Sequence, residues 1–160
     1  MKRILVLSDS HGDIIDLMTA ISSDKWDLVV HLGDCKADLL RVKNRFEGLA
    51  FENVSGNCDF DMLSESEKIV EVDGKKILLC HGHTYNVKAG YLNLEMAARQ
   101  KGVDVALFGH THKVFYDNHN GIVMMNPGSI GAPPFDVPPS YGILTINDDG
   151  TISTDIRYME

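Results

Sequence analysis

The sequence predicts an α/β fold in which two β-sheets pack face to face and helices cover the outside. Over residues 1–54, apolar branched runs alternate with segments whose apolar residues recur at helical spacing, which indicates a wound parallel sheet. From residue 113 onward, short apolar runs are separated by turn sequences, which indicates antiparallel hairpins. At 160 residues the chain is expected to form one domain, residues 1–160.

The N-terminal segment predicts a strand followed by a helix. Residues 2–8 form a nearly continuous apolar run, which is typical of a strand buried on both faces of a sheet. Residues 13–22 predict a helix with one apolar face, capped by Asp13 or the residues just before it. The apolar residues of this helix are Ile14, Ile15, Leu17, Met18 and Ile21.

The next two strands continue the alternation. Residues 27–32 and 49–54 predict strands, and residues 36–46 predict the helix between them. We therefore expect three parallel strands joined by right-handed crossovers. The residues expected to face inward from this helix are Leu39, Leu40, Val42 and Phe46.

The middle of the chain has a different pattern. Residues 67–72 and 75–80 flank Asp73-Gly74, a strong hairpin signal. Residues 87–101 predict a helix that ends at Gly102 as its C-cap, and residues 103–108 predict another buried strand. The helix residues available to the core are Leu92, Leu94, Met96 and Ala97.

The C-terminal third predicts strands without helices. We expect strands at residues 114–116, 122–125, 141–146 and 151–158. Residues 126–129 predict a tight loop, and four prolines between residues 133 and 139 predict a stiff, irregular connection.

Composition and charge narrow the class of protein. The net charge is −8, which argues against a nucleic-acid surface that works by bulk electrostatics. No run reaches the roughly 18 apolar residues of a membrane span, and the first strand is too short for a signal-peptide core. We therefore expect a cytoplasmic protein with no membrane partner. Cys35, Cys58 and Cys80 are odd in number and lack a C-x-x-C spacing, which argues against disulfides and a structural zinc site.

Polar side chains recur where the predicted strands end. Each group follows an apolar run and has a glycine next to it in the sequence, which lets the backbone turn sharply. Oxygen and imidazole donors without thiolates suit manganese, iron, nickel or zinc. Eight donors are too many for one catalytic ion and fit two ions that share a carboxylate, for which Asp34 is the natural candidate. The eight are Asp9, His11, Asp34, Asn57, His81, His83, His110 and His112.

The order of these motifs resembles the calcineurin-like metallophosphoesterases, most closely their small single-domain phosphodiesterase branch in bacteria and archaea. The motifs are Asp9-x-His11, Gly33-Asp34, Gly56-Asn57, His81-Gly82-His83 and Gly109-His110-x-His112, and the resemblance spans about residues 1–129. It implies a two-sheet sandwich flanked by helices.

The resemblance also implies a ligand set and a mechanism. One metal would be held by Asp9, His11, Asp34 and His112, and the second by Asp34, Asn57, His81 and His110. A hydroxide bridging two divalent ions, manganese in the first instance, would attack phosphorus. Asp34 and Asn57 would then belong to the catalytic centre. His83 would contact the substrate phosphate or support the ligands, and we favour a role in the site.

Cys58 is a departure from the family pattern. Many relatives have a histidine there, which assists the leaving group or contacts the phosphate. A thiol is a weak hydrogen-bond donor, so the substitution favours diester over monoester substrates. Asp59, which would orient such a histidine, is expected to form local hydrogen bonds instead.

Other polar and sulfur-containing residues have structural interpretations. We expect His31 to be a hydrogen-bonded core histidine, His119 to be solvated, and Cys35 and Cys80 to pack as small apolar residues. Asn126, Gly128 and Ser129 are interpreted as a structural turn in preference to a substrate contact. The methionines at positions 18, 96, 124 and 125 are expected in the core.

Two functions from different classes follow. The favoured one is a two-metal enzyme acting on a small phosphodiester. The alternative is a catalytically silent scaffold of the same fold, as in the retromer subunit. A scaffold has no physical reason to keep eight metal donors, because clustered Asp and His destabilise a protein when unpaired. The strand-rich C-terminal half is a candidate surface for a homo-oligomer.

Overall fold

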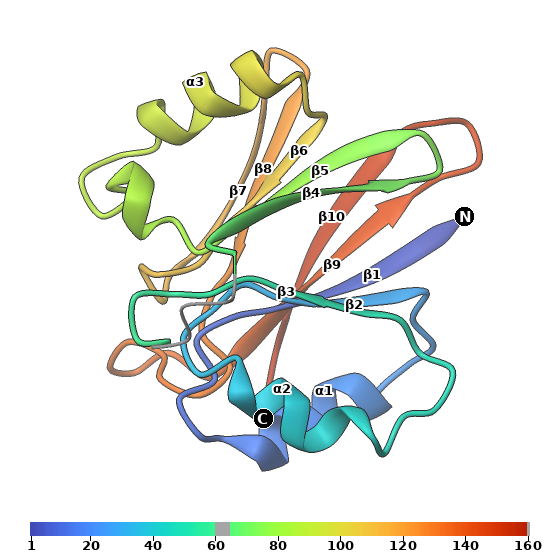
Figure 1. Ribbon diagram of the computed structural model, residues 1–160, viewed down its shortest axis with the longest axis vertical. Helices are drawn as coiled ribbons and strands as arrows, with labels where there is room; N and C mark the ends of the chain where they lie inside the picture. Colours follow the sequence, from blue (N-terminus) through green and yellow to red (C-terminus); the bar gives the residue numbers. More distant parts are fainter. Residues whose placement is uncertain (60–64, 160) are drawn as a thin grey trace.

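The chain forms two mixed five-stranded sheets with helices on the outer faces (Figure 1). The computed structural model describes residues 1–59 and 65–159. The described elements are β1 Lys2–Leu7, α1 Ile14–Ser22, β2 Leu28–His31, α2 Ala37–Lys43, β3 Phe51–Asn53, β4 Glu67–Val72, β5 Lys75–Cys80, the 3₁₀ turn η1 His83–Tyr85, α3 Leu92–Lys101, β6 Val105–Leu107, β7 Val114–His119, β8 Ile122–Pro127, β9 Ser140–Ile146 and β10 Ile152–Tyr158.

The strand order confirms the predicted αββα sandwich. The first sheet runs β10-β9-β1-β2-β3, with β1, β2 and β3 parallel. The second runs β4-β5-β6-β8-β7, with β5, β6 and β8 parallel. The hairpin β9-β10 returns to the first sheet, where β9 pairs antiparallel with β1. Figure 1 shows α1 and α2 below the first sheet and α3 above the second.

Burial in β1 explains the sandwich. Ile4 and Val6 belong to the apolar cluster between the two sheets, whereas Leu5 and Leu7 pack toward α1 and α2. All four side chains are fully buried, as predicted for a strand covered on both faces. Each buried side chain stabilises the fold by about 1.5–3 kcal/mol. Burial on both faces therefore holds β1 between the second sheet and the two helices.

The two N-terminal helices form as predicted, with differences in which residues face inward. Asp13 caps α1, and its carboxylate accepts a hydrogen bond from the Asp16 N–H at 3.0 Å. The predictions that Ile15 and Leu40 face inward are wrong, since both are exposed. The stripes that contact the sheet are Leu17, Ala20 and Ile21 in α1 and Leu39 and Val42 in α2.

Helix α3 begins at Leu92, five residues later than predicted. The physical reason is Gly90, whose φ of +149° is incompatible with a helix. The predictions of Leu92 and Met96 as core residues are also wrong, because Leu94 and Ala98 form the buried stripe and the other two are exposed. The C-cap at Gly102 is confirmed by its φ of +66°.

The predicted loop at residues 126–129 starts later than expected. Strand β8 continues through Pro127, whose partner in β7 is Val114. None of the helices in the described ranges 1–59 and 65–159 is long and apolar enough to cross a membrane.

Candidate metal centre

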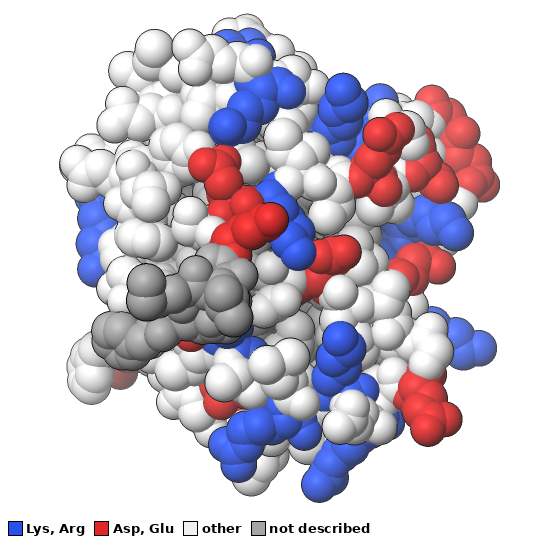
Figure 2. Space-filling model, viewed as in Figure 1, with Lys and Arg blue, Asp and Glu red and all other residues white. Residues whose placement is uncertain are grey.

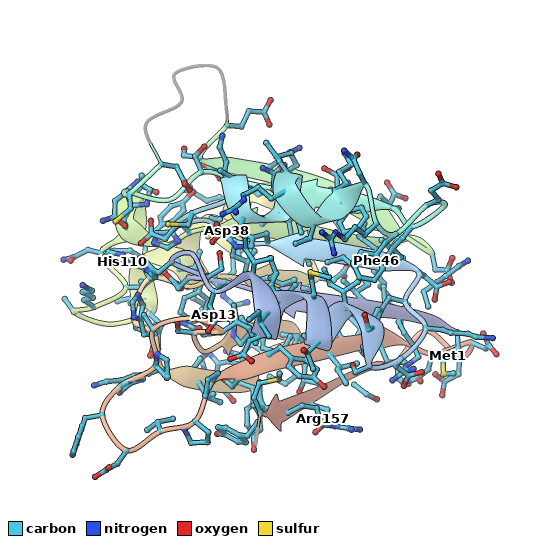
Figure 3. All side chains as sticks on the ribbon, turned by 90° about the horizontal axis from the view of Figure 1, so that it is seen from below. Met1, Asp13, Asp38, Phe46, His110 and Arg157 are labelled. Atoms are coloured by element: carbon cyan, nitrogen blue, oxygen red, sulfur yellow. The ribbon has the colours of Figure 1, made fainter. Side chains whose placement is uncertain are left out.

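Six of the predicted donors converge where strands of both sheets end. Parallel strands bring the residues after their C-terminal ends to one edge, and here the edges of the two sheets adjoin. Figure 3 shows His110 toward the end of the molecule opposite Met1. The six are Asp9 and His11 after β1, Asp34 after β2, His81 after β5, and His110 and His112 after β6.

The donors form two groups that share Asp34. In the first group, the donor atoms of Asp9, His11, Asp34 and His112 all lie within 4.8 Å of one another. The second group, with the same spacing limit, is Asp34, His81 and His110. A carboxylate common to both groups is what two neighbouring ions with one shared ligand require.

The distances within each group fit ligands of one cation. His112 Nε2 lies 3.3 Å from Asp9 Oδ1, and His81 Nε2 lies 3.3 Å from Asp34 Oδ2. Donor atoms bound to one ion at about 2.0–2.2 Å lie about 3–4 Å apart. Asp9 Oδ1 is also buried and has no hydrogen-bond partner within the described part of the chain. A buried carboxylate oxygen without a donor is costly unless a cation binds it, so the residues present fit a metal.

Hydrogen bonds on the far side of each ligand aim it at the cluster. His81 Nδ1–H donates to the Leu32 carbonyl at 2.8 Å, and His112 Nδ1–H donates to the Ala132 carbonyl at 2.7 Å. Each bond holds a ring hydrogen on Nδ1, so that Nε2 faces the cluster and offers a lone pair to a metal ion whenever the ring is neutral. The second oxygen of Asp9 accepts from the Ser8 hydroxyl at 2.6 Å.

Asp59 holds the loop that carries Asp34. Its two carboxylate oxygens accept four backbone N–H bonds at 2.8–3.1 Å. An ionised carboxylate has about four acceptor positions, so Asp59 is saturated. The expectation of local hydrogen bonding by Asp59 holds only for the Gly56 N–H, because the other three donors lie 23–25 residues away in the sequence. Its donors are the N–H groups of Asp34, Cys35, Lys36 and Gly56.

A buried chain of hydrogen bonds supports the loop after β1. The Gly33 N–H donates to His31 Nδ1 at 3.1 Å, which places the ring hydrogen on Nε2, facing Ser10 Oγ at 2.9 Å. The Ser10 hydroxyl donates to Asp38 Oδ2 at 2.7 Å. Burial lowers the pKa of His31 to about 4, so the ring is neutral. His31 is therefore the hydrogen-bonded core histidine that the sequence predicts.

The electrostatics of the cluster suit a cation. Burial alone would raise the pKa of Asp34, but hydrogen bonds from His81 and the Cys58 backbone outweigh it and hold the pKa below its ordinary value. Burial, then the charges of His81 and Lys88, lower the pKa of His110 to about 4. Asp34 is thus ionised and His110 is neutral at pH 7, the states in which both bind metals.

Several ligands have left-handed backbone conformations. Such a conformation costs a residue with a side chain roughly 1–3 kcal/mol and concentrates at functional sites. It turns the chain sharply at the end of each strand. The φ angles are 55° for Asp9, 45° for His11, 60° for Asp34, 73° for His110 and 62° for His112.

Two glycines are required by close approach to these ligands. A Cβ at Gly56 would lie 2.2 Å from Asp34 Oδ1, and one at Gly109 would lie 2.0 Å from Ser8 Oγ. Any larger residue at either position would displace a carboxylate or its hydrogen-bond donor. This close approach explains why glycine occupies both positions.

The remaining predicted site residues lie at the border of the cluster. Asn57 is exposed and follows Gly56, while the ring of His83 lies 5.5 Å from that of His81 and 6.1 Å from that of His110. His83 Nδ1 is buried and has no partner among the residues the structure describes. The metal-binding role of Asn57 and the substrate role of His83 stay predictions.

The cysteines divide between core and surface. Cys80 is buried, as expected, and the thiol of Cys58 is exposed. The prediction that Cys35 packs in the core is wrong, because it is half-buried and its sulfur lies 4.0 Å from His11 Nδ1. His119 is exposed, as predicted.

Sequence patterns missed the residues that support the ligands from elsewhere in the chain. Asn126 Nδ2 donates to the Gly109 carbonyl at 3.0 Å, and Ser129 Oγ donates to the Asp9 carbonyl at 2.7 Å. The structural interpretation of both residues is correct. The link to the ligand loops was not visible, because the partners are distant in sequence.

Comparison with known proteins agrees with this geometry. The model of the calcineurin-like phosphoesterase superfamily domain matches residues 1–149. The chain is 36% identical over 150 residues to "Probable metallophosphoesterase YsnB" of Bacillus subtilis, covering 92% of this chain and 86% of that protein. It is 28% identical over 145 residues to "Phosphodiesterase MJ0936" of Methanocaldococcus jannaschii, covering 79% and 82%. The crystal structure of a predicted phosphoesterase from Streptococcus pneumoniae TIGR4 matches with a TM-score of 0.80 at 26% identity, covering 98% of this chain and 89% of that one.

Proposed function

This chain belongs to the calcineurin-like phosphoesterase superfamily, and from this premise we propose that it is a phosphodiesterase that works with two divalent metal ions. The observation that carries the proposal is the position of Asp34, whose carboxylate is common to both donor groups. A single binding site would not need a second group of donors on the far side of the same carboxylate.

We propose the ligand set that the resemblance implies. One ion is held by Asp9, His11, Asp34 and His112, and the other by Asp34, Asn57, His81 and His110; the donor groups support all of these except Asn57, whose loop lies against Asp34 through Gly56. When bound, the ions lower the pKa of water so that hydroxide can attack phosphorus at neutral pH, and they stabilise negative charge in the transition state. Imidazole and carboxylate donors suit manganese first, then nickel, iron or zinc.

The chain's own residues hold and orient this centre. Asp59 fixes the backbone of the Asp34 loop, and the Leu32 and Ala132 carbonyls orient His81 and His112. His83 presents an imidazole beside His81 and His110, where it can donate to a phosphate oxygen. We therefore propose that His83 binds the substrate phosphate.

The preference for diesters rests on Cys58. Its thiol is exposed, and partial desolvation followed by the charge of Asp34 raises its pKa, so it is neutral at pH 7. A neutral thiol is a poor proton donor to a leaving alcohol, whereas general acid assistance is typically worth about 10²–10⁴-fold. A diester with an acidic leaving group needs this help least. The relative from Methanocaldococcus jannaschii is also named a phosphodiesterase.

The experiment compares a diester with its monoester. Chelated protein is reconstituted with Mn²⁺ and assayed with bis(4-nitrophenyl) phosphate and 4-nitrophenyl phosphate. We expect metal-dependent hydrolysis with a higher kcat/KM for the diester. Metal binding without turnover of either compound would favour the scaffold alternative, and a wide preference for the monoester would overturn the diester assignment.

A further inference from the structure

A pocket beside the metal centre is lined by two lysines that the proposed function does not use. Its volume is about 360 Å³, within the range of small-molecule sites. Thr111 separates the ligands His110 and His112, so the pocket reaches within one residue of both donor groups. Its lining residues are Val87, Lys88, Tyr91, Thr111 and Lys113.

Both lysines are exposed and carry charges without an acidic partner. By contrast, the exposed Lys101 Nζ lies 3.6 Å from Glu67 Oε2, and the half-buried Lys68 Nζ lies 2.9 Å from Glu52 Oε2. Within the described residues, neither Lys88 nor Lys113 has such a partner. Figure 2 shows how basic and acidic side chains otherwise intermingle on one face of the molecule. In a chain of net charge −8, two unpaired ammonium groups beside one pocket provide a local attraction for an anion.

The pocket wall is rigid and offers a further donor. Thr111 Oγ1 accepts hydrogen bonds from Asn126 Nδ2 at 3.0 Å and from the Lys113 N–H at 3.1 Å. Its own hydrogen has only a long contact of 3.4 Å to the Lys113 carbonyl, so the hydroxyl can turn toward a ligand. The ring of Tyr91 packs on Phe115 with centroids 4.2 Å apart, which fixes the opposite wall.

We propose that this pocket binds a second, non-reacting phosphate group of the substrate. The preferred substrates are then phosphodiesters in which one alcohol carries a further phosphate. This rests on the proposed function, because the reacting phosphorus occupies the adjacent metal centre. A phosphate monoester carries about −1.5 to −2 charges at pH 7 and three acceptor oxygens, which match two ammonium groups and a hydroxyl.

The test uses two substrates with the same leaving group. Thymidine 5′-(4-nitrophenyl phosphate) is compared with its 3′-phosphorylated form, using Mn²⁺-loaded protein. We expect the 3′-phosphate to raise kcat/KM by about tenfold or more, because charge-assisted contacts to exposed lysines are modest individually and add when two act on one dianion. In the double variant Lys88→Gln/Lys113→Gln this ratio should fall to about one. The matched control Lys25→Gln, which removes an exposed lysine from the α1–β2 connection, should keep the wild-type ratio.

A binding measurement separates this proposal from the proposed function. Calorimetric titration with thymidine 3′,5′-bisphosphate and thymidine 5′-monophosphate should show about tenfold tighter binding of the bisphosphate by wild type and by Lys25→Gln, but not by the double variant. If neither substrate is turned over while this difference persists, the proposed function is wrong and the pocket assignment stands. Equal affinity of wild type for both nucleotides, or a ratio unchanged by the double substitution, would overturn the pocket assignment.

Discussion

The two sheets contribute chemically different halves of the candidate metal centre. The first sheet provides both carboxylates, Asp9 and Asp34, together with His11, whereas the second provides only histidines. The first half is held by side-chain networks, through Asp59 and through His31 with Asp38. Backbone carbonyls orient His81 and His112. The first sheet therefore provides the negative charge of the site and most of the side-chain hydrogen bonds that position its ligands.

This contrast predicts the largest effect at Asp34. Asp34→Asn removes the charge shared by both donor groups, so we expect kcat/KM to fall by about 10³-fold or more and both ions to be lost, while the fold persists. His112→Ala, in the second sheet, should remove one ion. Metal analysis, circular dichroism and kinetics of the two variants check this. Near-normal turnover with both metals present in Asp34→Asn would refute the shared position.

The His31 network predicts a pH dependence of stability. The pKa of His31 in the folded protein is about 4, below its ordinary value of 6.5. Between these values the unfolded chain binds a proton that the folded chain does not, so the free energy of unfolding falls as the pH falls through this window. The full contribution is about 3 kcal/mol.

The variants for this test are His31→Gln and, as a control, Lys25→Gln at an exposed residue outside the His31 network. Urea unfolding of chelated protein at pH 7 and pH 4 should show a smaller loss of stability for His31→Gln than for wild type. Lys25→Gln should behave like wild type. Equal losses of stability in all three proteins would show that folding does not lower the pKa of His31.

Asp59 tests whether the side-chain network positions the first half. Asp59→Asn replaces an acceptor oxygen with an NH₂ group that opposes backbone N–H donors, so the Asp34 loop should move. Loss of such support typically lowers metal affinity by about 10–100-fold. Asp155→Asn, on the exposed strand β10, is the control. Mn²⁺ titration followed by calorimetry measures the effect. Unchanged affinity in Asp59→Asn would show that Asp59 does not position Asp34 for metal binding.

The smallest effect is expected at Cys58. Cys58→His adds an imidazole, but Asp59 already accepts four N–H bonds and has no free acceptor position to orient it. We therefore expect the diester-to-monoester ratio of kcat/KM to change by less than about tenfold, which is below the about 10²–10⁴-fold that general acid assistance typically provides. Assays with the two nitrophenyl esters measure the ratio. A shift of about 10³-fold or more would mean that the imidazole is oriented by another group.

Features that depend on neighbouring residues could be predicted from the sequence. Contacts between residues far apart in the chain could not. Asp9, Asp34 and His81 could be placed at strand ends because an apolar run followed by a polar residue and a glycine is a local pattern. Ser129 could not be linked to Asp9, because their hydrogen bond joins residues 120 positions apart. Helix α3 was predicted too long because apolar periodicity outweighed Gly90, whose conformation ends the preceding turn.

The most direct test of the shared metal centre is the number of ions that one chain binds. Wild-type protein is stripped with chelator, dialysed against Mn²⁺ at about a hundred times the dissociation constant, and analysed for metal and protein. We expect two ions per chain and a stabilisation of about 2.7 kcal/mol for each independent site at that concentration. One ion or fewer per chain at saturation, with melting curves that overlap those of the chelated protein, would contradict it.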